Sequence, residues 1–195
     1  THLATGHQIA ESQQRQFTED MMRQVLTVSL VEQHVDLKDP AIASCVIGDG
    51  YGVLSSMLLK TFPARKVILV NLTKTLLADL TFLSRAVPGV RIALAQDEEE
   101  MKTAFDDPDI NAIAVRADDA GVIRAAPIGA AFNLVSMHEM NPEIIAGYFK
   151  ILRTNQADAT AFYCCNRINK VLADGTVTKF FQYPWHPDDR FTVDE

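Results

Sequence analysis

Apolar residues in this chain alternate between short continuous runs and stripes at helical spacing. The stripe of Leu54, Met57, Leu58 and Phe62 repeats every three or four positions, as on one face of an amphipathic helix. The continuous runs predict buried strands at residues 43–47, 67–70, 90–95, 112–115, 132–137 and 159–165. This alternation predicts a Rossmann-like α/β fold: an open, mostly parallel sheet with helices on both faces.

The two ends of the chain carry their own signals. In residues 1–40, Phe17, Met21, Val25 and Val28 recur at helical spacing, which predicts an N-terminal helical segment. Residues 41–195 then supply the Rossmann-like part, and we expect a single domain overall. Near the other end, Asp174-Gly175 lies between two strand-like runs at 169–172 and 176–181, which predicts an antiparallel hairpin.

The motif Gly48-Asp49-Gly50-Tyr51-Gly52 directly follows the first predicted strand and precedes a helix. Such a turn exposes unpaired N–H groups and the positive end of the helix dipole, which suits a nucleotide-like cofactor. The dinucleotide fingerprint G-x-G-x-x-G requires its third glycine where Val53 stands, so the spacing disfavours a pyrophosphate cradle. The alternative is a tight strand-to-helix turn that binds nothing.

Composition limits the classes of partner. The 195 residues carry a net charge of −7, which works against nucleic acid, since phosphate neutralisation needs a clustered basic face. The sequence holds no uncharged apolar run of the roughly 18 residues that a membrane span requires, and residues 1–16 are too polar for a signal peptide. We therefore expect a cytoplasmic protein with a small-molecule or sugar substrate. Because the first residue is Thr, we expect a piece of a longer protein.

No metal site is predicted. The three cysteines have no ligand-like spacing, and we expect buried thiols. His2, His7 and His34 lack acidic partners at ligand spacing.

Five short segments together resemble a bacterial family of sugar O-methyltransferases, within the class I methyltransferases that use S-adenosylmethionine. They are residues 47–52, Ser136-Met137-His138-Glu139-Met140, Tyr148-Phe149, Asn166-Arg167 and Tyr183-Pro184-Trp185. The resemblance implies that the glycine motif wraps the methionine part of the cofactor. It also implies that the 136–140 segment faces this loop from the end of another strand, beside the transferred methyl group.

Two positions depart from the family pattern. Val46 and Asn71 stand where the family usually has acids, the second of which accepts hydrogen bonds from the ribose hydroxyls. Asn71 can accept only without charge assistance, so weaker cofactor binding is expected. Asp118 is predicted to accept from the adenine amino group, with Asp97 as a rival; either could be a solvated aspartate instead. The predicted cofactor residues are Gly48, Asp49, Gly50, Tyr51, Gly52, Asn71, Asp118 and Ser136.

Methyl transfer to a hydroxyl needs a base, and His138 is the only histidine within a matching segment. Glu139 could serve instead, or could bind a sugar hydroxyl; on a strand the two would point oppositely. The alternative for His138 is a simple hydrogen bond in a loop. Trp185 and His186 could either enter the acceptor pocket or form a packed C-terminal anchor.

Three functions stay open: an O-methyltransferase acting on a sugar or glycan-precursor hydroxyl, a methyltransferase-like binding or assembly module without catalysis, and an NAD-dependent oxidoreductase. The absence of the family's acids at Val46 and Asn71 favours the binding module without catalysis. The strand-glycine-helix unit is the only feature that supports the oxidoreductase. The sequence specifies neither the acceptor nor the oligomeric state.

Overall fold

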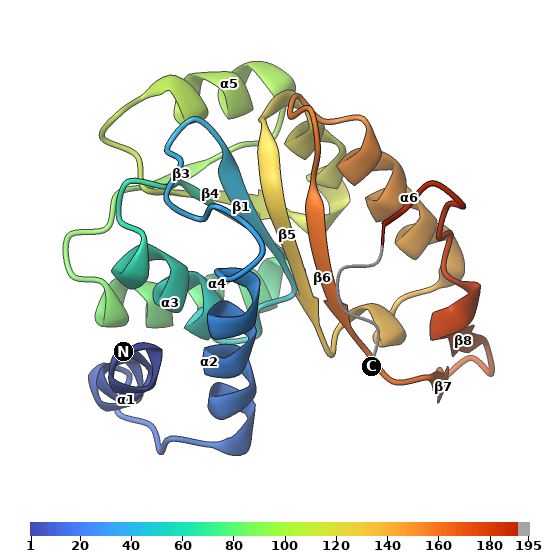
Figure 1. Ribbon diagram of the computed structural model, residues 1–195, viewed down its shortest axis with the longest axis horizontal. Coiled ribbons are helices and arrows are strands. Elements are labelled where there is room, and N and C mark those ends of the chain that lie inside the picture. Colours follow the sequence, from blue (N-terminus) through green and yellow to red (C-terminus); the bar gives the residue numbers. More distant parts are fainter. Residues whose placement is uncertain (191–195) are drawn as a thin grey trace.

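The computed structural model describes residues 1–190 and is built on a six-stranded sheet (Figure 1). Its strands run in the order β3-β4-β2-β1-β5-β6, and every neighbouring pair is parallel. The predicted α/β class with a Rossmann-like parallel sheet is confirmed. The strands are β1 (Ala43–Ile47), β2 (Val67–Asn71), β3 (Ile92–Leu94), β4 (Ala112–Arg116), β5 (Ile128–Leu134) and β6 (Ala161–Cys165).

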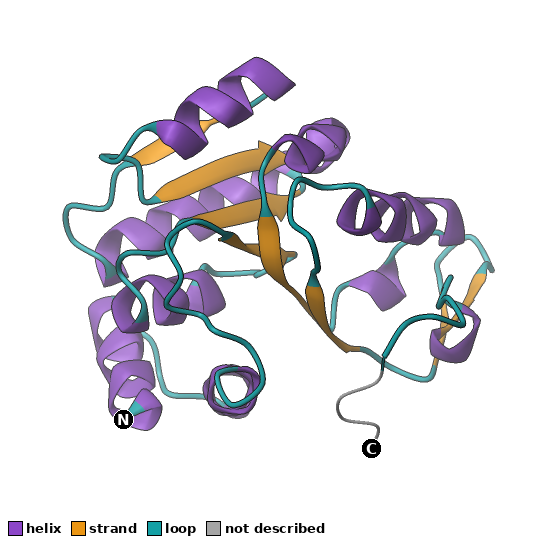
Figure 2. Cartoon of the chain, turned by 45° about the horizontal axis from the view of Figure 1, so that its top comes forward, coloured by secondary structure: helices purple, strands orange, loops and turns teal. Residues whose placement is uncertain are grey.

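Helices cover both faces of this sheet (Figure 2). Two of them begin at a side-chain N-cap. The Thr18 hydroxyl accepts from Met21 N at the start of the helix that begins at Glu19, and the Asp97 carboxylate accepts from Glu100 N at the start of the helix that begins at Glu98. The α-helices are α1 (His2–Ser12), α2 (Glu19–Val31), α3 (Val53–Thr61), α4 (Thr73–Ala86), α5 (Glu98–Asp106) and α6 (Pro142–Arg153). A 3₁₀ helix, η1 (Ala117–Ala125), follows β4.

Two apolar cores lie on opposite faces of the sheet. Along β1, Val46 joins one core while Cys45 and Ile47 join the other, as the alternation of a strand requires. The first core contains side chains from α1 to α4, and the second contains side chains from α5, η1 and α6. The helices of residues 1–40 therefore share a core with the sheet.

The predicted hairpin is present but separate from the main sheet. β7 (Asn169–Val171) and β8 (Val177–Lys179) pair antiparallel across a turn in which Gly175 has a φ of +88°. The second strand is shorter than predicted, because the chain turns into the 3₁₀ helix η3 (Phe180–Gln182).

The prediction of a strand over residues 132–137 is wrong in its bounds. β5 begins at Ile128 and ends at Leu134, and a 3₁₀ turn, η2 (Met137–Glu139), follows. Val135 takes a φ of +58°, and the side-chain oxygen Oδ1 of Asn133 accepts from Met137 N at 3.1 Å. The Asn133 side chain therefore binds the Met137 N–H, which in a longer β5 would have been free to pair with the neighbouring strand. Among residues 1–190, no helix combines the length and the apolar character needed to cross a bilayer.

Candidate functional site

All the predicted site residues follow the carboxyl ends of strands. Because the six strands are parallel, these ends lie along one edge of the sheet. The glycine motif follows β1, Asn71 ends β2, Asp118 follows β4, and the segment from Ser136 to Met140 follows β5. This carboxyl edge is the candidate site.

The glycine motif forms a loop whose backbone favours glycine at three positions. Gly48, Gly50 and Gly52 have φ values of +76°, +81° and +62°, in the left-handed region. A Cβ on Gly52 would lie 2.5 Å from the carbonyl oxygen of Asp79 in α4, so Gly52 also allows close helix packing. A Cβ on Gly50 would meet no atom within 4 Å. The loop backbone at Gly50 is therefore open to a ligand.

Asp49 caps the helix that the loop begins. Its two carboxylate oxygens accept from Leu54 N at 3.0 Å and from Ser55 N at 2.8 Å. Burial raises the pKa of Asp49, and the hydrogen bonds from the α3 N-terminus oppose that rise. The position at which a helix N-terminus would hold a ligand phosphate is occupied by the protein's own carboxylate.

Asn71 is turned toward a second buried acid. Its Nδ2 donates to Asp79 Oδ2 at 2.8 Å, and its Oδ1 accepts from Leu72 N at 2.9 Å. The Asp79 side chain is fully buried, and its Oδ1 has no hydrogen-bond partner. Burial, reinforced by the nearby charge of Asp49, raises the pKa of Asp79 to about 7.

The segment between α1 and α2 lies against the loop. Gln13 is buried and donates from Nε2 to the Tyr51 carbonyl at 3.2 Å. The Arg15 guanidinium lies over the Tyr51 ring, 3.8 Å from its centroid, and the Tyr51 ring meets Phe82 edge-on. The N-terminal helices thus fix the outer side of the glycine loop.

A buried asparagine joins the loop to the segment after β5. Asn133 Nδ2 donates to the Ile47 carbonyl at 2.8 Å and to Ser136 Oγ, and Ser136 Oγ itself donates to the Ile47 carbonyl at 3.0 Å. Ser136 lies against Gly48, since a Cβ on Gly48 would come within 2.6 Å of Ser136 Cβ. The structure therefore brings the glycine motif and the segment from Ser136 to Met140 into direct contact.

His138 and Glu139 stand together on η2 rather than on opposite faces of a strand. His138 is 2% exposed: its Nδ1 lies 3.1 Å from Asn166 Oδ1, and its Nε2 lies 3.2 Å from Glu139 Oε1. Glu139 is 54% exposed and also pairs with Lys170 of β7 at 2.9 Å. The hydrogen bond from Lys170 is the main cause that lowers the pKa of Glu139. Both ring nitrogens of His138 are engaged, and Glu139 is the group that reaches solvent.

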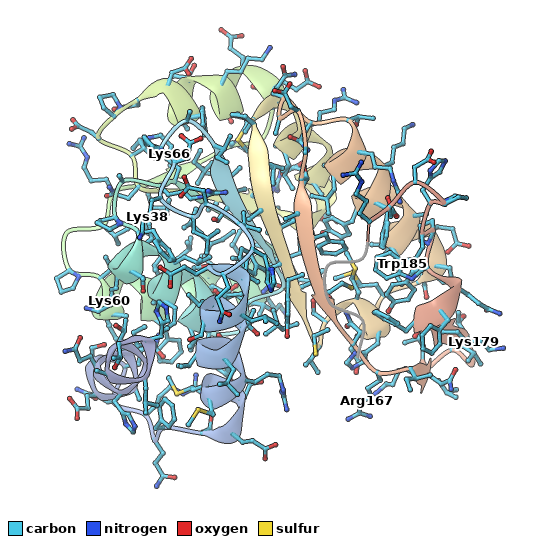
Figure 3. The ribbon with its side chains drawn as sticks, in the orientation of Figure 1. Lys38, Lys60, Lys66, Arg167, Lys179 and Trp185 are labelled. Atoms are coloured by element: carbon cyan, nitrogen blue, oxygen red, sulfur yellow. The ribbon has the colours of Figure 1, made fainter. Side chains whose placement is uncertain are left out.

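The remaining candidates are more peripheral. Asp118 is exposed on η1, and Asp97 is used as the cap of α5. Trp185 packs edge-on against Phe149 of α6, and its indole N–H donates to the Phe180 carbonyl at 3.0 Å, which fits the packed anchor (Figure 3). His186 is exposed and pairs with Asp188.

Two surface hollows lie beside the edge strand β3. One, of about 260 Å³, is mainly apolar and reaches from Leu76 to Arg116; the other, of about 540 Å³, is more polar and is bordered by α5. Neither includes the glycine loop. Within residues 1–190, no group of three or more His, Cys, Asp or Glu side chains could hold a metal ion.

Sequence reasoning missed several residues that organise the site. Asp79 interrupts the apolar helical stripe of Leu76 and Leu83, and Asn133 interrupts an apolar strand. A polar residue at a position expected to be buried could have marked both as candidates for a structural or functional role. Gln13 and Arg15 gave no signal, because their contacts depend on the packing of α1.

No protein-family description matches this chain, and no curated protein sequence matches it significantly.

Proposed function

We propose that this chain binds S-adenosylmethionine at the carboxyl edge of the sheet and transfers its methyl group to a hydroxyl of a sugar or glycan precursor. The observation that carries the choice of cofactor is the Asp49 cap of α3. A dinucleotide would have to place its pyrophosphate against that carboxylate, whereas a positively charged sulfonium is compatible with it. The loop backbone has room to contact the cofactor at Gly50, where a Cβ would meet no atom within 4 Å.

The carboxyl edge also provides groups for the acceptor. When bound, the cofactor supplies an electrophilic methyl group. Glu139 is the ionised group of this segment that reaches solvent, so it is the group that can take the proton of an incoming hydroxyl; the Lys170 hydrogen bond lowers its pKa and makes it a weaker base. His138 contacts the same carboxylate from the buried side and orients it. The sugar class rests on the sequence resemblance of the segments that contain Ser136 and Trp185.

A second function, a methyltransferase-like binding module without catalysis, is favoured by the same His138. Both of its ring nitrogens lie against oxygens, so the imidazole offers no free lone pair to a substrate in this arrangement. Binding of the cofactor product without turnover is the behaviour that this second function predicts.

A turnover measurement distinguishes the methyltransferase from the binding module. The chain is incubated with S-adenosylmethionine and a panel of free and nucleotide-linked sugars, and the release of S-adenosylhomocysteine is measured against a sample without acceptor. Acceptor-dependent release supports the enzyme. If S-adenosylhomocysteine binds in calorimetry while no acceptor is methylated, the binding module is favoured instead.

A further inference from the structure

We propose that Asp79 is a positioning residue for the ribose end of the cofactor and acts through Asn71. The inference rests on the proposed function, because it assumes a ligand with ribose hydroxyls at the end of β2. Asp79 lies inside α4 with no exposed surface, so it does not touch the ligand itself. Its contact with the site is the 2.8 Å hydrogen bond from Asn71 Nδ2.

This bond and its neighbour fix which way the Asn71 amide faces. An ionised carboxylate only accepts hydrogen bonds, and the Leu72 N–H only donates. The amide nitrogen of Asn71 must therefore point inward to Asp79, and its oxygen must point outward to Leu72 N, where the hydrogen bond is exposed. The oxygen retains a second lone pair for a ribose hydroxyl.

Asp79 also supplies the charge that Asn71 lacks. A negative charge behind the amide nitrogen polarises the amide and strengthens its oxygen as an acceptor. The acid expected at position 71 is thus replaced by an amide with an acid directly behind it. The Asp79 backbone also packs against the glycine loop, since a Cβ on Gly52 would lie 2.5 Å from the Asp79 carbonyl oxygen, so Asp79 links the end of β2 to that loop.

Neighbouring groups set the pKa of Asp79. Asp49 faces it from the glycine loop and disfavours its charge, whereas Asn71 and the Gly52 backbone favour it. Of the other charged side chains on or against α4, Lys74 is exposed in the first turn of the helix. Arg15 and Arg85 lie at Phe82, and Lys60 lies at the Ala86 carbonyl. Because Asp79 changes charge near neutral pH, ligand affinity is expected to change with it.

The test measures S-adenosylhomocysteine binding by calorimetry at about pH 6 and pH 8, on either side of the Asp79 transition. The variants are Asp79→Asn, the exchanged pair Asn71→Asp with Asp79→Asn, and Thr81→Ala as a control on the exposed side of the same helix. The exchange places the acid at position 71 and keeps one amide-to-carboxylate hydrogen bond. Thermal unfolding confirms that each variant is folded.

The wild type and Thr81→Ala should bind about fivefold more tightly at the higher pH. Asp79→Asn should bind as weakly at both pH values as the wild type does at the lower one, and the exchanged pair should recover the tighter affinity. The inference is overturned if Asp79→Asn keeps the wild-type affinity and pH profile, or if the exchange fails to recover binding. A wild type that binds at neither pH contradicts the proposed function instead.

Discussion

Gly48 and Ser136 fit together so closely that a Cβ on Gly48 would come within 2.6 Å of Ser136 Cβ. They lie 88 positions apart in the sequence, and their contact joins the glycine loop after β1 to the turn after β5. The two strands are neighbours, so each supplies one side of the same edge.

The contact predicts unequal costs for alanine in the loop. Gly48→Ala should lower the free energy of unfolding by about 2–4 kcal/mol, because it adds a clash to an unfavourable φ of +76°. Gly50→Ala, with a φ of +81° and open space around its Cβ, should cost only about 1 kcal/mol. Urea unfolding of both variants measures the difference. Equal losses would show that Ser136 does not press on Gly48.

Asp79 predicts a decline in stability as pH rises. Its folded-state pKa of about 7 lies above the ordinary value of 3.8, so the folded state binds the proton more tightly than the unfolded state does. The resulting stabilisation is complete below about pH 4 and is lost as pH rises through about 7. Urea unfolding across this range, compared with Asp79→Asn, isolates the contribution. A pH dependence that is identical in the variant would contradict it.

Val135 predicts a stabilising substitution. It is β-branched, its φ is +58°, and its side chain is partly exposed, so Val135→Gly should relieve strain at little cost in packing. We expect the free energy of unfolding to rise by about 1 kcal/mol. The neighbouring Leu134→Gly, at a strand position without this strain, is the control and should be destabilising. A loss of stability in Val135→Gly would mean that its side-chain contacts outweigh the strain.

Glu139 predicts a separation of binding from catalysis. If its carboxylate accepts the acceptor proton, Glu139→Gln should lower kcat by about 10²-fold to 10⁴-fold. The affinity for S-adenosylhomocysteine should stay unchanged, since Glu139 lies on the turn after β5 and not on the glycine loop. Steady-state kinetics and calorimetry on the same preparation measure both. An unaltered kcat would remove Glu139 from the chemistry.

Much of the fold follows from local patterns. The bounds of β1, β2 and β4 were close to prediction, because continuous apolar runs act locally. The end of β5 was missed because Asn133 takes the Met137 N–H, a contact that strand propensity does not encode.

The candidate site was predicted less completely. Gly48 and Ser136 were expected to face each other, and the strand order places them in contact. The partners of Asn71 and His138 could not be foreseen, since Asp79 and Asn166 reach them only through the packing of α4 and the end of β6.

A thermal-shift comparison shows which cofactor the glycine loop binds. The full chain is heated with S-adenosylhomocysteine, with NAD, or with buffer alone, because a ligand that binds only the folded state raises the Tm. With Asp49 occupying the N-terminus of α3, S-adenosylhomocysteine should raise the Tm and NAD should leave it unchanged. A rise with NAD and none with S-adenosylhomocysteine would contradict the account.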